Sequence, residues 1–139
     1  MGRYDDLLYQ LIKNGLRNSF QKVFKREIDE LIMKHPGVPT DYIEFLEEIG
    51  YGDIGEEYFM LYGSLVDAEV IYGKSKCDGL KDIVFLGDYY NGHSIGFSKK
   101  GEWEMVEVDN NQDITFLNIT FEGFIKNKLD EYLGMRYFR

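Results

Sequence analysis

The chain has 139 residues, of which 44% are hydrophobic and 29% charged, and its formal net charge is −9. This length suits one folded domain with a substantial core, and this composition excludes intrinsic disorder. No apolar run approaches the roughly 18 residues that a membrane span needs, and no secretory signal pattern opens the chain. The single cysteine, Cys77, excludes an intrachain disulfide. We therefore expect a cytoplasmic protein.

The negative charge is concentrated in one stretch. Residues 37–73 contain nine acidic residues and no Lys or Arg, whereas residues 1–36 have a net charge of +2 and residues 74–139 of −2. A field of this sign repels phosphate backbones and attracts basic proteins. The sequence therefore argues against direct nucleic-acid binding and favours a basic protein partner, with a solubilising surface as the open alternative.

Three helices are expected in the first 50 residues. The apolar spacing predicts helices over Tyr4–Lys13, over about residues 18–34, and from Thr40, a capable N-cap, to Gly50. In the second helix we expect the following residues to face inward: Phe20, Phe24, Ile28, Leu31 and Ile32. In the third, Tyr42, Phe45, Leu46 and Ile49 have the spacing of a buried face.

The residue pattern in the middle of the chain predicts strands. They are expected at Tyr58–Tyr62, Ile83–Leu86, His93–Ser98, Glu102–Val108 and Ile114–Leu117, with a short helix over Leu65–Tyr72. Ile83–Leu86 is continuously apolar, which is typical of a strand covered on both faces, and Asn91-Gly92 favours a hairpin. Thr120 caps a last helix. The pattern predicts an α+β single domain with N-terminal helices, a central antiparallel-rich sheet and a C-terminal helix.

Several catalytic and metal-binding motifs match short segments of the sequence, but the residues around these segments do not fit the motifs. Gly92–Gly96 fits the G-x-S-x-G nucleophile elbow around Ser94, but a hairpin strand follows it and no histidine follows the serine. Asp109–Asp113 resembles the opening of a calcium loop, yet the required glycine and glutamate are absent. A Cys77–His93 thiol pair remains an open but weaker interpretation. We expect no metal, no cofactor and no catalytic residue.

Acidic and aromatic residues gather in two turns. Asp53, Glu56 and Glu57 lie in a Gly-rich turn, and Asp88 lies at a strand end. Such carboxylates could form an acid/base pair, although an acidic loop is more often only solvated. Tyrosines beside these turns and the single tryptophan are candidate binding anchors, since Tyr and Trp dominate interface hot spots: Tyr58, Tyr89, Tyr90 and Trp103. Trp103 is expected in a strand, where core and interface remain alternatives.

Four pieces of the chain together resemble the SUKH superfamily. Val38–Leu46 followed by Ile49–Gly52 is similar to its "P-x-D-Y-x-x-F-L … G-x-G" pattern. Phe59–Tyr62 resembles its first strand, and Phe121–Leu129 its closing helix. Ile83–Asp88, then Gly92 and Ile95–Phe97, resembles its hairpin. The resemblance covers residues 22–133 of a single domain over residues 1–139, with residues 1–15 as an added N-terminal helix.

The resemblance implies an α+β domain without catalytic residues or cofactor. It implies that many bacterial members are immunity proteins that bind and neutralise a toxin, and that fungal members are interaction hubs linked to cell-wall glucan synthesis. It assigns no binding residue to this chain.

The sequence and the resemblance lead to one hypothesis. We expect a monomeric, non-enzymatic immunity protein that binds a cognate, basic, nuclease-type toxin. The predicted contact residues are Asp53, Glu56, Glu57, Tyr58, Asp88, Tyr89, Tyr90 and Trp103. The alternatives are an adaptor of the cell-wall-regulator type without a toxin partner, and a small hydrolase.

Overall fold

A computed structural model of the chain describes residues 2–55 and 57–137. The helices are α1 (Asp5–Lys13), α2 (Lys25–Lys34), α3 (Thr40–Glu48), α4 (Ala68–Tyr72) and α5 (Phe121–Tyr137), with 3₁₀ turns at Arg17–Ser19, Lys74–Lys76 and Asp78–Leu80. The strands are β1 (Phe20–Gln21), β2 (Tyr51–Ile54), β3 (Phe59–Asp67), β4 (Ile83–Asp88), β5 (Ser94–Ser98), β6 (Glu104–Val108) and β7 (Ile114–Phe116).

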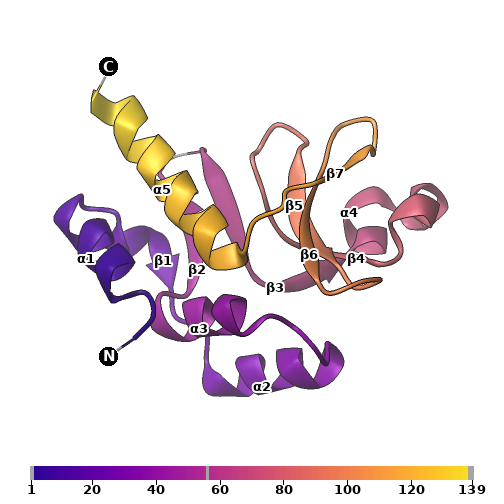
Figure 1. Cartoon of the computed structure of the whole chain (residues 1–139), viewed down its shortest axis with the longest axis horizontal. Helices are drawn as coiled ribbons and strands as arrows, with labels where there is room; N and C mark the ends of the chain where they lie inside the picture. Colours follow the sequence, from indigo (N-terminus) through magenta and orange to yellow (C-terminus); the bar gives the residue numbers. More distant parts are fainter. Residues whose placement is uncertain (1, 56, 138–139) are drawn as a thin grey trace.

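The strands form one antiparallel sheet in which spatial order follows chain order. Helices α1, α2, α3 and α5 pack on one face, while α4 and the 3₁₀ turns after it lie on the other (Figure 1). Strand β4 is buried between the two layers: Val84 and Leu86 join the larger core, and Ile83 and Phe85 join the smaller one. The predicted α+β architecture and the doubly covered strand are confirmed.

Helix α3 joins the other helices to the sheet through an aromatic cluster. Its predicted inner face is buried as expected, because Tyr42, Phe45, Leu46 and Ile49 are each at most 2% exposed. The Phe121 ring of α5 lies 5.2 Å from that of Tyr42 and 5.5 Å from that of Phe45. Edge-to-face ring contacts of this kind stabilise a core beyond the area they bury.

The predicted second helix is wrong in its first half. Residues 17–19 form a 3₁₀ turn, and Phe20 and Gln21 form strand β1, which pairs with Tyr51 and Gly52 of β2. Phe24 is 61% exposed, outside a helix that begins at Lys25, and Ile32 is 42% exposed. Strand pairing with β2 overrides the local helical spacing here, since tertiary contacts decide short segments.

Other element boundaries also shift. Strand β3 extends from Phe59 to Asp67 through an irregularity in its pairing with β4, so the expected helix over Leu65–Tyr72 shrinks to α4. The N-cap of α3 is Pro39, and Thr40 is already helical. The predicted cap of α5 is confirmed, because the Thr120 hydroxyl oxygen accepts a hydrogen bond from the Gly123 N–H at 3.1 Å.

His35, just after α2, makes stability depend on pH. It is buried, and neither ring nitrogen has a hydrogen-bond partner within the described part of the chain. Desolvation first, and then the positive charges of Lys99 and Lys34, lower its pKa, against an opposing effect of Asp67. The His35 ring therefore binds a proton less readily in the folded state than in the unfolded state. As a result, the free energy of unfolding falls as pH drops below about 6.5.

We expect His35→Leu to weaken this acid sensitivity. The substitution removes two buried polar atoms, which should raise the free energy of unfolding by about 1 kcal/mol at neutral pH. Melting followed by circular dichroism should show the wild type losing more thermal stability than the variant between pH 7.5 and pH 5.5. An equal loss in both proteins would rule out His35 as the titrating group.

Candidate functional site

Three hairpin turns meet at one end of the sheet. The β2–β3 and β4–β5 turns lie side by side because Met60, just after the first, pairs with Asp88, just before the second. The Tyr90 hydroxyl of the β4–β5 turn donates a hydrogen bond to Asp53 of β2. A Cβ on Gly92 would overlap the Asn110 side chain, which places the β6–β7 turn next in line. The structure thus brings the two predicted acidic turns together.

Pairing across the sheet also places several polar side chains on the face occupied by α4. Asp53 pairs with Met60, Met60 with Asp88, and Asp88 with Ser94. Paired residues of antiparallel strands point to the same face. The carboxylates of Asp53 and Asp88 therefore belong to one row, on the side of the sheet opposite α5.

Tyr90 is constrained both in its backbone and in its side chain. Its backbone has φ +70°, in the left-handed region that bulky residues rarely adopt. The Tyr90 N–H donates to Asp88 Oδ1 at 2.8 Å and its hydroxyl donates to Asp53, yet the side chain is 45% exposed. Such backbone strain, of order 1–3 kcal/mol, persists where surrounding contacts impose it and often marks functional sites.

Desolvation and the hydrogen bond to Asp53 raise the pKa of the Tyr90 hydroxyl, which therefore remains protonated and donates. Asp88 likewise accepts from two directions, since the Tyr62 hydroxyl donates to its Oδ2 at 2.5 Å. Among the described residues no Lys, Arg or His pairs with Asp53, Glu57 or Asp88. Their charges are therefore not neutralised by neighbours. We call Asp53, Glu57, Asp88 and Tyr90 the tip surface.

The remaining predicted residues differ in their surroundings. Glu57 is exposed with φ +55°, Glu56 lies outside the described residues, and Asp53 belongs to strand β2 rather than to a turn as predicted. Tyr58 and Tyr89 face α5. Desolvation and Glu131 raise the pKa of Tyr58 to about 12, and its hydroxyl donates to Glu131 at 3.1 Å. The Tyr89 ring lies under Lys128 Nζ at 4.9 Å.

Trp103 does not join this group. It lies in the β5–β6 turn, at the opposite end of these strands, because Ser98 pairs with Glu104 there. Its φ of +61° breaks the strand alternation that the sequence predicts, and β6 begins one residue later. Its ring contacts Phe97 and His35, and it lines a separate pocket of about 260 Å³. Trp103 is thus a partly buried residue at the edge of the larger core.

The acidic stretch of residues 37–73 does not form one continuous face. On α3, Glu44 pairs with Arg3 at 2.8 Å, and Glu48 accepts the Tyr4 N–H at 2.9 Å. Asp41 accepts the Glu122 N–H at the start of α5 at 3.0 Å. These three carboxylates are engaged in contacts within the chain. At the end of the sheet where the three hairpin turns meet, Asp109 and Asp113 of the β6–β7 turn add carboxylates that do not belong to the acidic stretch.

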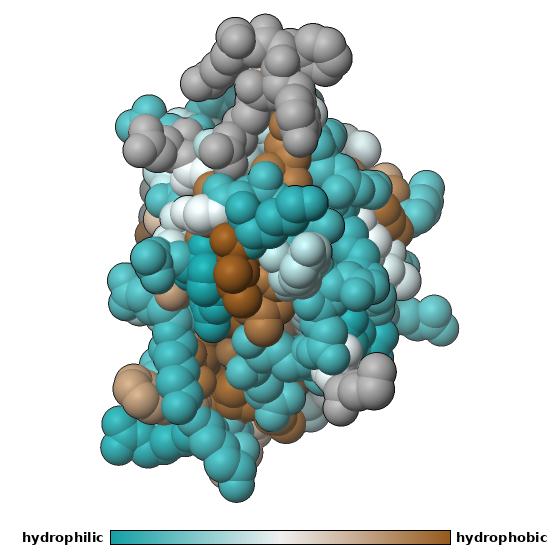
Figure 2. All heavy atoms as spheres, turned by 90° about the vertical axis from the view of Figure 1, so that its left-hand side faces the viewer, coloured by the Kyte–Doolittle hydropathy of each residue, from teal (hydrophilic) through white to brown (hydrophobic). Residues whose placement is uncertain are grey.

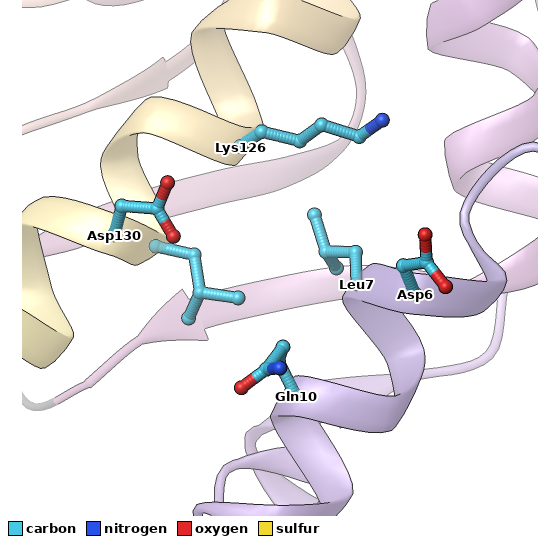
Figure 3. A pocket seen from close by; sticks show the side chains of 6 residues that line it. Asp6, Leu7, Gln10, Lys126 and Asp130 are labelled. Carbon is cyan, nitrogen blue, oxygen red and sulfur yellow. The ribbon is translucent and has the colours of Figure 1, made fainter.

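A second concave feature lies between α1 and α5. Figure 2 views this side of the molecule and shows apolar surface between hydrophilic side chains. The groove, of about 200 Å³, is lined by Asp6, Leu7, Gln10, Lys126, Leu129 and Asp130 (Figure 3). Among these lining residues the one cation, Lys126, pairs with Glu122 at 2.7 Å. None of these six lining residues is aromatic.

The residues of the alternative chemistries are placed apart from one another. Ser94 is buried within strand β5 in a hairpin, so the strand–turn–helix of a nucleophile elbow is not formed. Cys77 is buried and donates to the Lys74 carbonyl oxygen at 3.5 Å, whereas His93 pairs with Glu107 at 3.2 Å. Within residues 2–55 and 57–137, no three His, Cys, Asp or Glu side chains are grouped closely enough to hold a metal ion.

Sequence reasoning missed two tyrosines beside Asp88. Tyr62 of β3 and Tyr72 of α4 line a pocket of about 400 Å³ together with Asp88 and Tyr90. Alternation along β3 could have found Tyr62, since Phe59 and Leu61 face the larger core and place Met60 and Tyr62 on the other face. No feature of the sequence predicts that α4 lies beside Asp88.

Comparison of the chain with protein-family models, curated proteins and solved structures finds no match. None of the described helices combines the length and the apolar character that crossing a membrane requires.

Proposed function

We propose that this protein is a cytoplasmic immunity protein that binds a basic, nuclease-type toxin through the tip surface and so neutralises it. The observation that carries the proposal is Tyr90: a half-exposed aromatic side chain, fixed by Asp53 and Asp88, among carboxylates that no cation of the described chain neutralises.

Two physical effects support this role. An anchor that is already ordered loses less conformational entropy on binding, so more of its contact energy contributes to affinity. Unpaired negative charge accelerates association with a positively charged partner and repels competing nucleic acid. The substrate site of a nuclease is basic because it must hold phosphates. A partner of this chemistry therefore complements the tip surface.

The resemblance to the SUKH superfamily supports the same proposal. The α+β fold, the hairpin at Ile83–Phe97 and the closing helix α5 agree with the architecture that the resemblance implies. The toxin itself is expected to be encoded beside this chain, as a large protein with a variable C-terminal domain.

Co-expression tests the proposal directly. The C-terminal domain of the neighbouring toxin gene should arrest growth alone, and the wild-type chain should restore it through a complex that copurifies with the toxin. Glu47→Lys tests whether the rest of the acidic stretch contributes, since Glu47 is an exposed residue of that stretch outside the tip surface. It should restore growth fully. Arrest that persists with the wild-type chain, although both proteins are folded, would instead favour an adaptor without a toxin partner.

A further inference from the structure

The pocket beside the tip surface has three aromatic walls and one carboxylate. Its volume is about 400 Å³, and Tyr62, Tyr72 and Tyr90 line it with Asp88, while Ile71 of α4 adds an aliphatic side. Three separate elements supply the rings: β3, α4 and the β4–β5 turn.

Contacts within the protein orient each of the three rings. Tyr62 donates to Asp88 at 2.5 Å, Tyr72 is 3.5 Å from Ser94 Oγ, and Tyr90 donates to Asp53. The Tyr72 ring also packs edge-on against Phe85 at 5.8 Å. Hydrogen bonds therefore orient the Tyr62 and Tyr90 rings, and packing against Phe85 orients the Tyr72 ring.

This composition selects for a cation. The face of an aromatic ring is electron-rich and attracts ammonium or guanidinium groups, more strongly as water is excluded. Asp88 uses one oxygen for Tyr62 and the other for the Tyr90 N–H, and each carboxylate oxygen has a further lone pair to offer. No cation of the described residues pairs with it.

We infer that this pocket binds a basic side chain of the partner protein, with arginine preferred to lysine. The planar guanidinium stacks on tyrosine rings, is weakly hydrated and can bond a carboxylate with two N–H groups. Its methylene stem would lie against Ile71. The inference deepens the proposed function, because it names the residue of the basic partner that enters the tip region.

Capped amino acids test the pocket without any toxin. N-acetyl-arginine amide should shift the ring signals of Tyr62, Tyr72 and Tyr90 in aromatic NMR spectra, with weak affinity in the millimolar range. The corresponding citrulline amide, which is nearly isosteric but neutral, should bind about tenfold more weakly. Equal affinity for the two probes, or shifts confined to residues outside the pocket, would overturn the inference.

Matched substitutions at Tyr72 distinguish the contribution of its ring to arginine binding from that of its hydroxyl. Tyr72→Leu should weaken arginine binding roughly 3–10-fold, whereas Tyr72→Phe, which keeps the ring, should stay within about twofold of the wild type. If Tyr72→Leu does not fold, Asp88→Asn carries the test and should lose the preference for arginine over citrulline. A toxin complex without arginine binding would reject the pocket alone, and arginine binding without a toxin complex would reject the proposed function alone.

Discussion

Gly52→Ala should lower the free energy of unfolding by about 3 kcal/mol or more. Gly52 has φ +149°, and a Cβ at this position would overlap the carbonyl oxygen of Ser19. That oxygen belongs to the backbone that leads into β1, so it cannot move aside without breaking the pairing of Phe20 with Gly52. Urea unfolding followed by circular dichroism measures the change.

Gly79→Ala is the control for this prediction. Gly79 lies in the 3₁₀ turn Asp78–Leu80, and nothing stands within 4 Å of the Cβ it would gain. Its unfolding free energy should change by less than about 1 kcal/mol. Similar curves for the two variants would show that β1 and β2 are not joined as closely as the structure places them.

Tyr90→Gly should weaken the proposed toxin complex at least about 30-fold while leaving the fold intact, since loss of a hot-spot residue costs about 2 kcal/mol or more. Glycine adopts φ +70° without strain, so relief of strain offsets the lost hydrogen bond to Asp53. The free energy of unfolding should change by less than about 1 kcal/mol. Calorimetric titration and urea unfolding give the two quantities.

Tyr9→Ala serves as the matched control, because Tyr9 is 61% exposed and belongs to α1, which contributes no residue to the tip surface. It should change affinity by less than about twofold. If both variants bind as tightly as the wild type, Tyr90 is not an anchor. If Tyr90→Gly unfolds, the constrained tyrosine serves the fold and not the partner.

The sequence predicts those helices and strands that are long enough for the spacing of their apolar side chains to be recognised. The inner face of α3, the doubly covered strand β4 and the Thr120 cap each follow from a local pattern. Strands β1 and β2 could not be predicted in this way, since one has two residues and the other contains a glycine. They form because β1 pairs with β2 and β2 pairs with β3, and such pairing is not a local property.

Of the candidate site, the sequence predicts only the residues in and near the turns. Asp53 and Asp88 lie near turns and Tyr90 lies within one, and sheet pairing together with the hydrogen bonds of Tyr90 brings the three together. Tyr72 could not be assigned, because the path of β3 decides where α4 lies. The sequence predicts a strand at Trp103 because strand periodicity cannot show a single left-handed residue.

The most direct test of the tip surface is the rate at which the chain associates with the toxin domain. Asp53→Asn with Glu57→Gln removes two charges, while the amide oxygen that the first substitution introduces can still accept the Tyr90 hydroxyl. At about 20 mM salt the wild type should associate roughly tenfold faster than this variant, and the difference should largely vanish at about 500 mM. Equal association rates at low salt would contradict the central claim that these carboxylates steer a basic partner to this end of the sheet.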